Sequence, residues 1–89
     1  MPQRDIEIVN KLGLHARAAA KLTHVASGYQ CEIWISRSGR RVNAKSIMGV
    51  MMLAAARGTT VTIETSGPDE QEAMTALLEL IKDKFGESE

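Results

Sequence analysis

Four segments of the chain alternate apolar and polar residues, which is typical of β-strands that bury one face. The clearest is RDIEIVN, where Ile6 and Ile8 share one face and acidic side chains share the other. A Ser38-Gly39 pair separates the second segment from the third and favours a tight hairpin turn. The predicted strands cover residues 4–10, 31–37, 40–44 and 59–65.

Three other segments repeat apolar residues at the spacing of an α-helix. In the first, Ala18, Leu22 and Ala26 recur on one stripe, and Gly28 supplies a stop signal. Ser46 precedes the second as a favourable N-cap, because its hydroxyl can accept a hydrogen bond from an otherwise unpaired amide. The predicted helices cover residues 16–27, 47–55 and 68–85.

The order of these elements is β-α-β-β-α-β-α, and every predicted strand has one apolar face. A sheet covered by helices on one side alone satisfies that pattern. We therefore expect an α+β fold, an open-faced β-sandwich of two layers. With 89 residues, of which 44% are hydrophobic, residues 1–89 are expected to form a single domain.

Composition argues against several classes of protein. The longest strongly apolar stretch, residues 47–56, is far shorter than the roughly 20 residues of a membrane-spanning helix, and the amino terminus lacks the apolar part of a secretory signal. We therefore expect a soluble, cytoplasmic protein without membrane insertion. Cys31 is the only cysteine, so we expect a buried thiol rather than a disulfide. No pattern of metal ligands is present, and no cofactor is expected.

The charges cancel overall but are unevenly placed. Residues 1–62 carry nine Lys or Arg against three Asp or Glu, whereas residues 63–89 carry two against eight. The basic part favours an anionic ligand or an acidic partner surface. Nucleic acid is a weaker candidate, because aromatic residues make up only 3% of the chain and no long basic run is present.

The segment GLHARAAAKL, residues 13–22, places a histidine at the start of the first predicted helix. A histidine before a helix is commonly a surface residue or a weak cap. Here, however, backbone amides that lack intrahelical partners attract anions, and Arg17 can direct a guanidinium at any anion held there. Gly13 lets the loop bend closely, and the alanines leave His15 open to another protein. The pattern therefore favours a reactive ring.

The chemistry expected of such a ring is phosphoryl transfer. The positive end of the helix disfavours a protonated imidazole by about 0.3–1 kcal/mol, and a neutral imidazole nitrogen is a competent nucleophile toward phosphorus. Phosphoryl oxygens on His15 would bind the Arg17 side chain and the amides of Ala16, Arg17 and Ala18. No phosphate-binding loop or catalytic triad accompanies the histidine, so another protein is expected to supply the phosphoryl group.

GLHAR at residues 13–17 and KSIMGVMMLAA at residues 45–55, together with the element order, resemble the HPr family, the histidine-containing phosphocarriers of the bacterial phosphoenolpyruvate:sugar phosphotransferase system. The resemblance extends over essentially the whole chain and implies four antiparallel strands with three helices on one side. It also implies that His15 accepts a phosphoryl group on Nδ1 from phosphorylated enzyme I and passes it to a histidine of an enzyme IIA. Arg17 would handle the phosphoryl charge.

One residue departs from the family pattern, which usually has proline after the arginine, where this chain has Ala18. Proline would fix φ in the first helical turn, whereas alanine restores an N–H and has excellent helix propensity. The departure bears on the geometry at the helix start and not on the role of His15.

Ser46 has two compatible roles. Its position predicts a cap for the helix that follows. The resemblance adds a regulatory phosphorylation site for HPr kinase/phosphorylase, which many bacteria have. A phosphate there would add negative charge beside the expected docking surface.

The predicted helix 47–55 is apolar nearly all round, although a helix on a sheet can bury only one stripe. We assign Val50 and Leu53 to the core and Ile47, Met48 and Met51 to an exposed apolar surface for partners, with burial of the whole helix as the alternative. His24 is expected to be solvated and Trp34 partly exposed. The predicted partner-binding residues are Ile47, Met48, Met51, Lys21 and Lys45.

Other functions remain open at this point. The nitrogen-related branch of the same system, NPr, shares the histidine chemistry but serves regulatory partners. A purely regulatory binding module would act through Ser46 and its apolar neighbours, but relatives of that kind lack the active histidine. A small RNA-binding domain would show steeply salt-dependent affinity, which the zero net charge does not favour. We expect a monomeric phosphoryl carrier that serves larger enzymes, rather than a stand-alone catalyst.

Overall fold

A computed structural model describes residues 2–87, and the predicted order of strands and helices is confirmed. A short 3₁₀ turn follows the last helix. Within these residues, no helix combines the length and the apolar character needed to cross a membrane. The elements are β1 (Gln3–Glu7), α1 (Ala16–Ser27), β2 (Glu32–Arg37), β3 (Arg40–Asn43), α2 (Ile47–Met52), β4 (Thr60–Ser66), α3 (Glu70–Lys82) and η1 (Lys84–Gly86).

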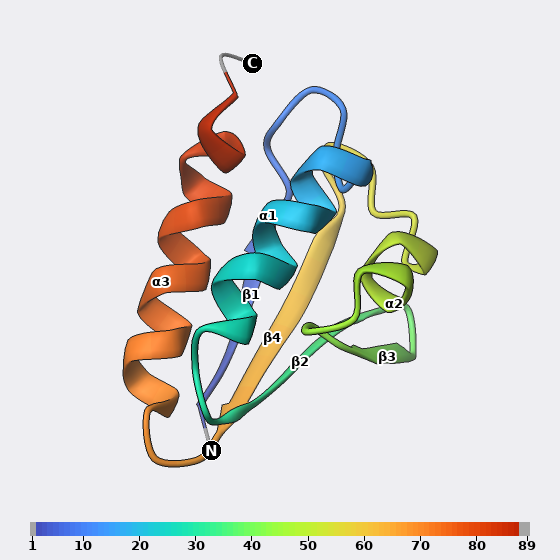
Figure 1. The fold of residues 1–89 in the computed structure, drawn as a ribbon. Coiled ribbons are helices and arrows are strands. Elements are labelled where there is room, and N and C mark those ends of the chain that lie inside the picture. Colours follow the sequence, from blue (N-terminus) through green and yellow to red (C-terminus); the bar gives the residue numbers. More distant parts are fainter. Residues whose placement is uncertain (1, 88–89) are drawn as a thin grey trace.

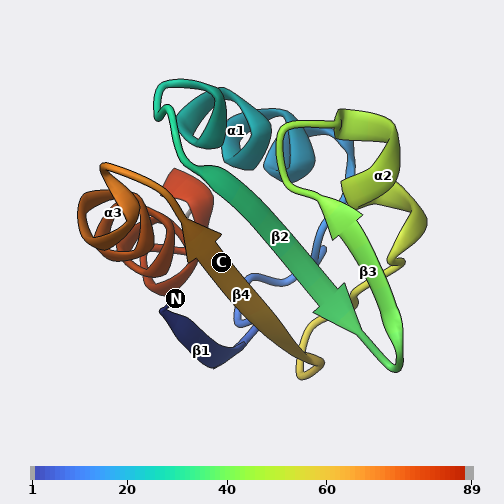
Figure 2. The same cartoon turned by 90° about the horizontal axis from the view of Figure 1, so that it is seen from below.

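The strands form one antiparallel sheet in the order β1-β4-β2-β3, and the three helices cover one of its faces (Figures 1 and 2). The register pairs Ile6 with Val61 and Ile35 with Ile63, so apolar side chains from neighbouring strands lie side by side. Val61, Ile35 and Ile63 are fully buried beneath the helices. The predicted α+β open-faced sandwich is therefore confirmed.

The turn between β2 and β3 is the predicted tight hairpin. Ser38 has φ of 50° and Gly39 has φ of 82°, so both residues are left-handed. Two left-handed residues give a turn whose twist matches that of the flanking strands. The turn sets the register in which Ile35 faces Val42.

The uncovered face of the sheet explains the partial exposure predicted for Trp34. The Arg41 guanidinium lies 4.2 Å from the centre of the Trp34 ring and also pairs with Glu64 at 3.3 Å. The cation therefore covers part of the indole face. His24, on α1, is exposed as predicted.

The second helix is shorter than predicted and ends at Met52 rather than Ala55. Arg37 Nη1 donates to Leu53 O at 2.9 Å, and Arg40 Nη1 donates to Met52 O at 3.1 Å. Donors from the β2–β3 hairpin thereby satisfy carbonyl groups at the end of α2 that would otherwise accept hydrogen bonds from a further helical turn. The helix can therefore end at Met52.

The start of the last helix also differs from the prediction, because α3 begins at Glu70 rather than Pro68. Asp69 makes no side-chain cap to its own helix. Its carboxylate instead accepts hydrogen bonds from the amides of Gln30 and Cys31, both at 2.9 Å. The amide of Gln30, more than any other group, lowers the pKa of Asp69. The carboxylate therefore joins the start of α3 to the segment that enters β2.

Cys31 is buried, as predicted. Burial is the largest cause that raises the pKa of its thiol to about 11, and a hydrogen bond with Asp69 adds to it. The thiol therefore stays protonated near neutral pH and behaves as a small apolar side chain.

The chain turns back sharply after α3. Lys84 and Phe85 both have φ of 57°, and Gly86 has φ of 76°. Phe85 is fully buried, and its carbonyl accepts a hydrogen bond from Lys21 Nζ at 2.6 Å. This turn brings the end of the chain to the same end of the molecule as the loop before α1 (Figure 1).

We expect Phe85→Ala to lower the free energy of unfolding by about 3–5 kcal/mol, because it empties a fully buried aromatic site. Urea unfolding followed by circular dichroism measures this value. Leu12→Ala is the matched control, since Leu12 is 66% exposed, and it should change stability by less than about 0.5 kcal/mol. Equal effects of the two substitutions would contradict the anchoring role of Phe85.

Candidate functional site

Gly13 holds the loop before α1 against the segment that follows α2. Its φ is +67°, and a β-carbon there would lie 2.5 Å from Ala55 O and 2.8 Å from Ala56 Cα. Leu14 N donates to the same Ala55 O at 2.9 Å. Only glycine fits a left-handed position with so little space. The contact therefore fixes the direction in which the chain enters α1.

His15 occupies the predicted N-cap position of α1, with extended backbone angles. Its carbonyl accepts the first helical hydrogen bond, from Ala19 N at 2.8 Å. Its imidazole forms no capping hydrogen bond with the helix, and 26% of the side chain is exposed. The ring is therefore held at the helix start by its backbone and remains accessible to another molecule.

The first turn of α1 leaves donors available beside this ring. Within residues 2–87, the amides of Ala16 and Arg17 have no hydrogen-bond acceptor, and the Arg17 side chain has no partner. Ala16 and Arg17 are exposed, so an anion can reach these donors. Ala18 is completely buried, so its amide is less accessible than those of Ala16 and Arg17, and its contact with a phosphoryl oxygen stays a prediction. Ala18 lies within the packed face of the helix.

A carboxylate near the end of the chain, which the sequence pattern does not predict, also contacts the ring. Glu87 Oε2 lies 2.6 Å from His15 Nε2, and Glu87 Oε1 accepts a hydrogen bond from Asn10 Nδ2 at 3.1 Å. The hydrogen bond from Asn10 is the largest cause that lowers the pKa of Glu87, followed by the one from His15. The only signal in the sequence was the acidic composition of residues 63–89, which does not single out one carboxylate.

Asn10 supports both sides of this arrangement. It is fully buried, and its amide nitrogen donates to Gly13 O at 2.9 Å as well as to Glu87. The two hydrogen atoms of one side-chain amide therefore join the loop before α1 to the end of the chain.

Ser46 caps α2, as predicted, because its Oγ accepts a hydrogen bond from Gly49 N at 3.2 Å. The residue is exposed. The cap uses the hydroxyl as an acceptor and leaves the oxygen at the surface.

The short helix α2 presents an exposed apolar surface, which we call the α2 patch. The predicted core residues Val50 and Leu53 are buried. The alternative that the whole helix is buried is wrong, because four of its large apolar side chains are 39–67% exposed. These residues are Ile47, Met48, Met51 and Met52, of which Met52 was not predicted.

The two lysines predicted to contact partners are already engaged within the fold. Lys21 Nζ donates to Phe85 O at 2.6 Å, and Lys45 Nζ donates to Tyr29 O at 2.7 Å. Both side chains are half-buried. Their ammonium groups stabilise turns at the ends of α3 and α1, and a contact with a partner would compete with these hydrogen bonds.

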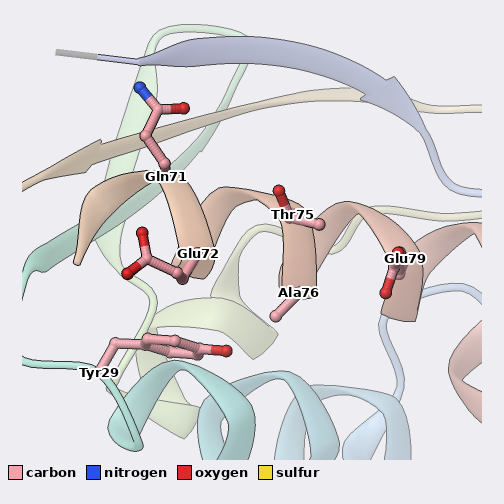
Figure 3. Close-up of a pocket in the computed structure, with 6 residues that line it drawn as sticks. All are labelled: Tyr29, Gln71, Glu72, Thr75, Ala76 and Glu79. Atoms are coloured by element: carbon pink, nitrogen blue, oxygen red, sulfur yellow. The ribbon is translucent and has the colours of Figure 1, made fainter.

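A separate open groove runs along α3 (Figure 3). None of the predicted site residues lines it. Within residues 2–87, no group of three metal-ligating side chains lies close together, here or elsewhere. The groove therefore offers no chemistry comparable to that around His15. Its lining residues are Tyr29, Gln71, Glu72, Thr75, Ala76 and Glu79.

We expect the contact between Glu87 and His15 to be lost in acid. The pKa of Glu87 is lowered from its ordinary value of 4.5, so the contact favours the ionised carboxylate. Its stabilising effect is present above that value and disappears as the pH falls through the lowered pKa. Carbon-13 NMR of the Glu87 carboxyl should give a lower midpoint in the folded protein than in the same protein unfolded in urea. Equal midpoints would contradict the observed hydrogen bonds.

Comparisons with known proteins agree on one family. A model of the family described as PTS HPr component phosphorylation site matches residues 2–83. The phosphocarrier protein HPr of Cupriavidus necator is 66% identical over 89 residues, which span 100% of both chains. The crystal structure of HPr-C-His from Thermoanaerobacter tengcongensis has a TM-score of 0.97 at 47% identity, with 100% of each chain covered. The HPr dimer from that organism has a TM-score of 0.79 at 48% identity and covers 98% of this chain and 100% of its own. The chain therefore belongs to the HPr family, the phosphocarriers of the phosphotransferase system.

Proposed function

We propose that this protein accepts a phosphoryl group on His15 from phosphorylated enzyme I and passes it to a histidine of an enzyme IIA. The observation that carries the proposal is the accessible, non-capping ring of His15 at the start of a helix whose first exposed amides have no acceptor in the described chain. This arrangement brings a nucleophile and binding groups for phosphoryl oxygens to the same place.

In the proposed transfer, a lone pair on Nδ1 of His15 forms a bond to phosphorus. The bond between phosphorus and the donor atom breaks, and its electron pair stays with the donor. The phosphoryl oxygens bind the amides of Ala16 and Arg17 and the Arg17 guanidinium, which offset their negative charge. The second transfer reverses these steps toward the acceptor histidine.

Docking to both enzymes is proposed to use the α2 patch. Its methionines can adapt to surfaces of different shape, because the side chain is unbranched and flexible. Leu12, in the loop before His15, is also exposed and can extend the apolar contact toward the ring. Lys21 and Lys45 would add contacts to acidic partners at the edge. We propose that the protein works in the cytoplasm as a monomer, although one solved relative is described as a dimer.

Regulation at Ser46 is a second component of the proposal. The exposed serine begins α2, and its neighbours Ile47 and Met48 belong to the α2 patch. A phosphate added by HPr kinase/phosphorylase would place about two negative charges against this docking surface and weaken binding there.

We expect wild-type protein, incubated with enzyme I and phosphoenolpyruvate, to gain an acid-labile and alkali-stable phosphate that His15→Ala does not gain. The physical reason is that phosphorus bonded to an imidazole nitrogen is released in acid. The control is His24→Ala, which removes the other histidine and should be labelled like wild type. Equal labelling of His15→Ala and wild type would contradict the proposal.

The same labelled protein separates the two branches of the system. Release of phosphate to a sugar-specific enzyme IIA supports the sugar branch, and release to a nitrogen-specific enzyme IIA alone supports the regulatory branch, NPr.

We expect Arg17→Glu to slow phosphoryl transfer by at least about tenfold, because it replaces a charge that binds the phosphoryl oxygens with one that repels them. Arg17 is exposed, so the free energy of unfolding should change by less than about 0.5 kcal/mol. Arg4→Glu makes the same charge change on β1, where the residue is also exposed, and should transfer at the wild-type rate. Unchanged transfer by Arg17→Glu would remove Arg17 from the mechanism.

A further inference from the structure

The carboxylate of Glu87 meets the ring of His15 at one nitrogen only. Glu87 Oε2 lies 2.6 Å from His15 Nε2, while Glu87 Oε1 accepts the hydrogen bond from Asn10. Each carboxylate oxygen therefore has its own donor, which fixes the orientation of the group. An ionised carboxylate accepts hydrogen bonds and donates none, so the hydrogen in the short contact belongs to Nε2.

When Nε2 holds the hydrogen, the lone pair of the neutral ring is on Nδ1. We propose that Glu87 is a positioning residue that keeps this hydrogen on Nε2 of His15, so that Nδ1 is the nitrogen that binds and releases phosphorus. The inference deepens the proposed carrier function and rests on it.

The role of Glu87 extends through both transfers. When Nδ1 forms its bond to phosphorus, the ring keeps the Nε2 hydrogen and gains positive charge, which the carboxylate of Glu87 stabilises. When the acceptor attacks phosphorus, the electron pair of the breaking bond returns to Nδ1. The ring then leaves as neutral imidazole, because its hydrogen has stayed on Nε2 throughout. No proton needs to be supplied or removed between the two steps.

The turn formed by residues 84–86 places the Glu87 carboxylate beside His15. Lys84 and Phe85 are left-handed without being glycine, a conformation that costs about 1–2 kcal/mol for each residue. Complete burial of Phe85 and the hydrogen bond from Lys21 to its carbonyl offset that cost. The positive charge of Lys21 also favours the ionised form of Glu87.

The test measures where the ring hydrogen lies and how fast phosphate moves. Nitrogen-15 NMR of labelled histidine at alkaline pH should show a protonated Nε2 and a bare Nδ1 in wild type. Glu87→Ala and Glu87→Gln should give mixtures of the two tautomers, since neither side chain imposes one. Phosphorylation of both variants by phosphorylated enzyme I should be about tenfold slower, as expected for loss of a charge-assisted hydrogen bond.

Glu79→Gln is the matched control, because it removes one exposed carboxylate of α3 away from the ring. Its ring spectrum and transfer rate should equal those of wild type. The inference is overturned if Nδ1 carries the hydrogen in wild type, or if both Glu87 variants keep the wild-type spectrum and rate. Faster transfer by the variants would also overturn it, since the carboxylate would then obstruct the site.

The two proposals fail in different ways. If wild type takes phosphate on His15 and the Glu87 variants match it, only the role of Glu87 is lost. If wild type takes no phosphate, the carrier function fails, and the role of Glu87 in transfer fails with it, whatever the ring spectra show.

Discussion

Contact between Gly13 and the backbone of Ala55 and Ala56 brings together the parts of the molecule that act on His15. A β-carbon at Gly13 would lie within 3 Å of backbone atoms from both alanines, so the two segments touch without an intervening side chain. The loop before α1 is thereby fixed to the segment that leaves α2. Together with the hydrogen bond from Leu14 N to Ala55 O, this contact places the loop that carries Leu12 and His15 beside the segment that follows the α2 patch.

The segment that follows α3 makes a second contact with the loop before α1. Antiparallel order β1-β4-β2-β3 places β1 and β4 side by side, and α3 then runs back across the sheet toward the end of the molecule where α1 begins (Figure 1). Phe85 is buried there and directs Glu87 to the ring. The candidate site is therefore assembled from two loops and a tail, each held by packing, around His15, the proposed acceptor of the phosphoryl group. A ring supported in this way can stay exposed to partners and still keep a defined orientation.

Much of the fold followed from local patterns. Alternation of apolar residues located all four strands, and the Ser38-Gly39 turn, the Ser46 cap and the burial of Cys31 were predicted from residue type and position alone. For the helices, the predictions were wrong at the end of α2 and at the start of α3, where residues distant in sequence supply the hydrogen bonds. The second helix ends at Met52 because guanidinium groups of the hairpin reach its carbonyls, and no pattern within residues 47–55 contains that information.

For the site, the sequence by itself determined a histidine and an arginine at the start of a helix, after a glycine, because helical periodicity and capping act over a few neighbouring residues. Only the tertiary structure decided that Ala18 is buried and that Lys21 holds the carbonyl of Phe85. It alone also placed Glu87 at Nε2, 72 residues further along the chain than His15. Such a contact depends on how layers pack and on a turn of left-handed residues, and these are properties of the whole chain rather than of any segment.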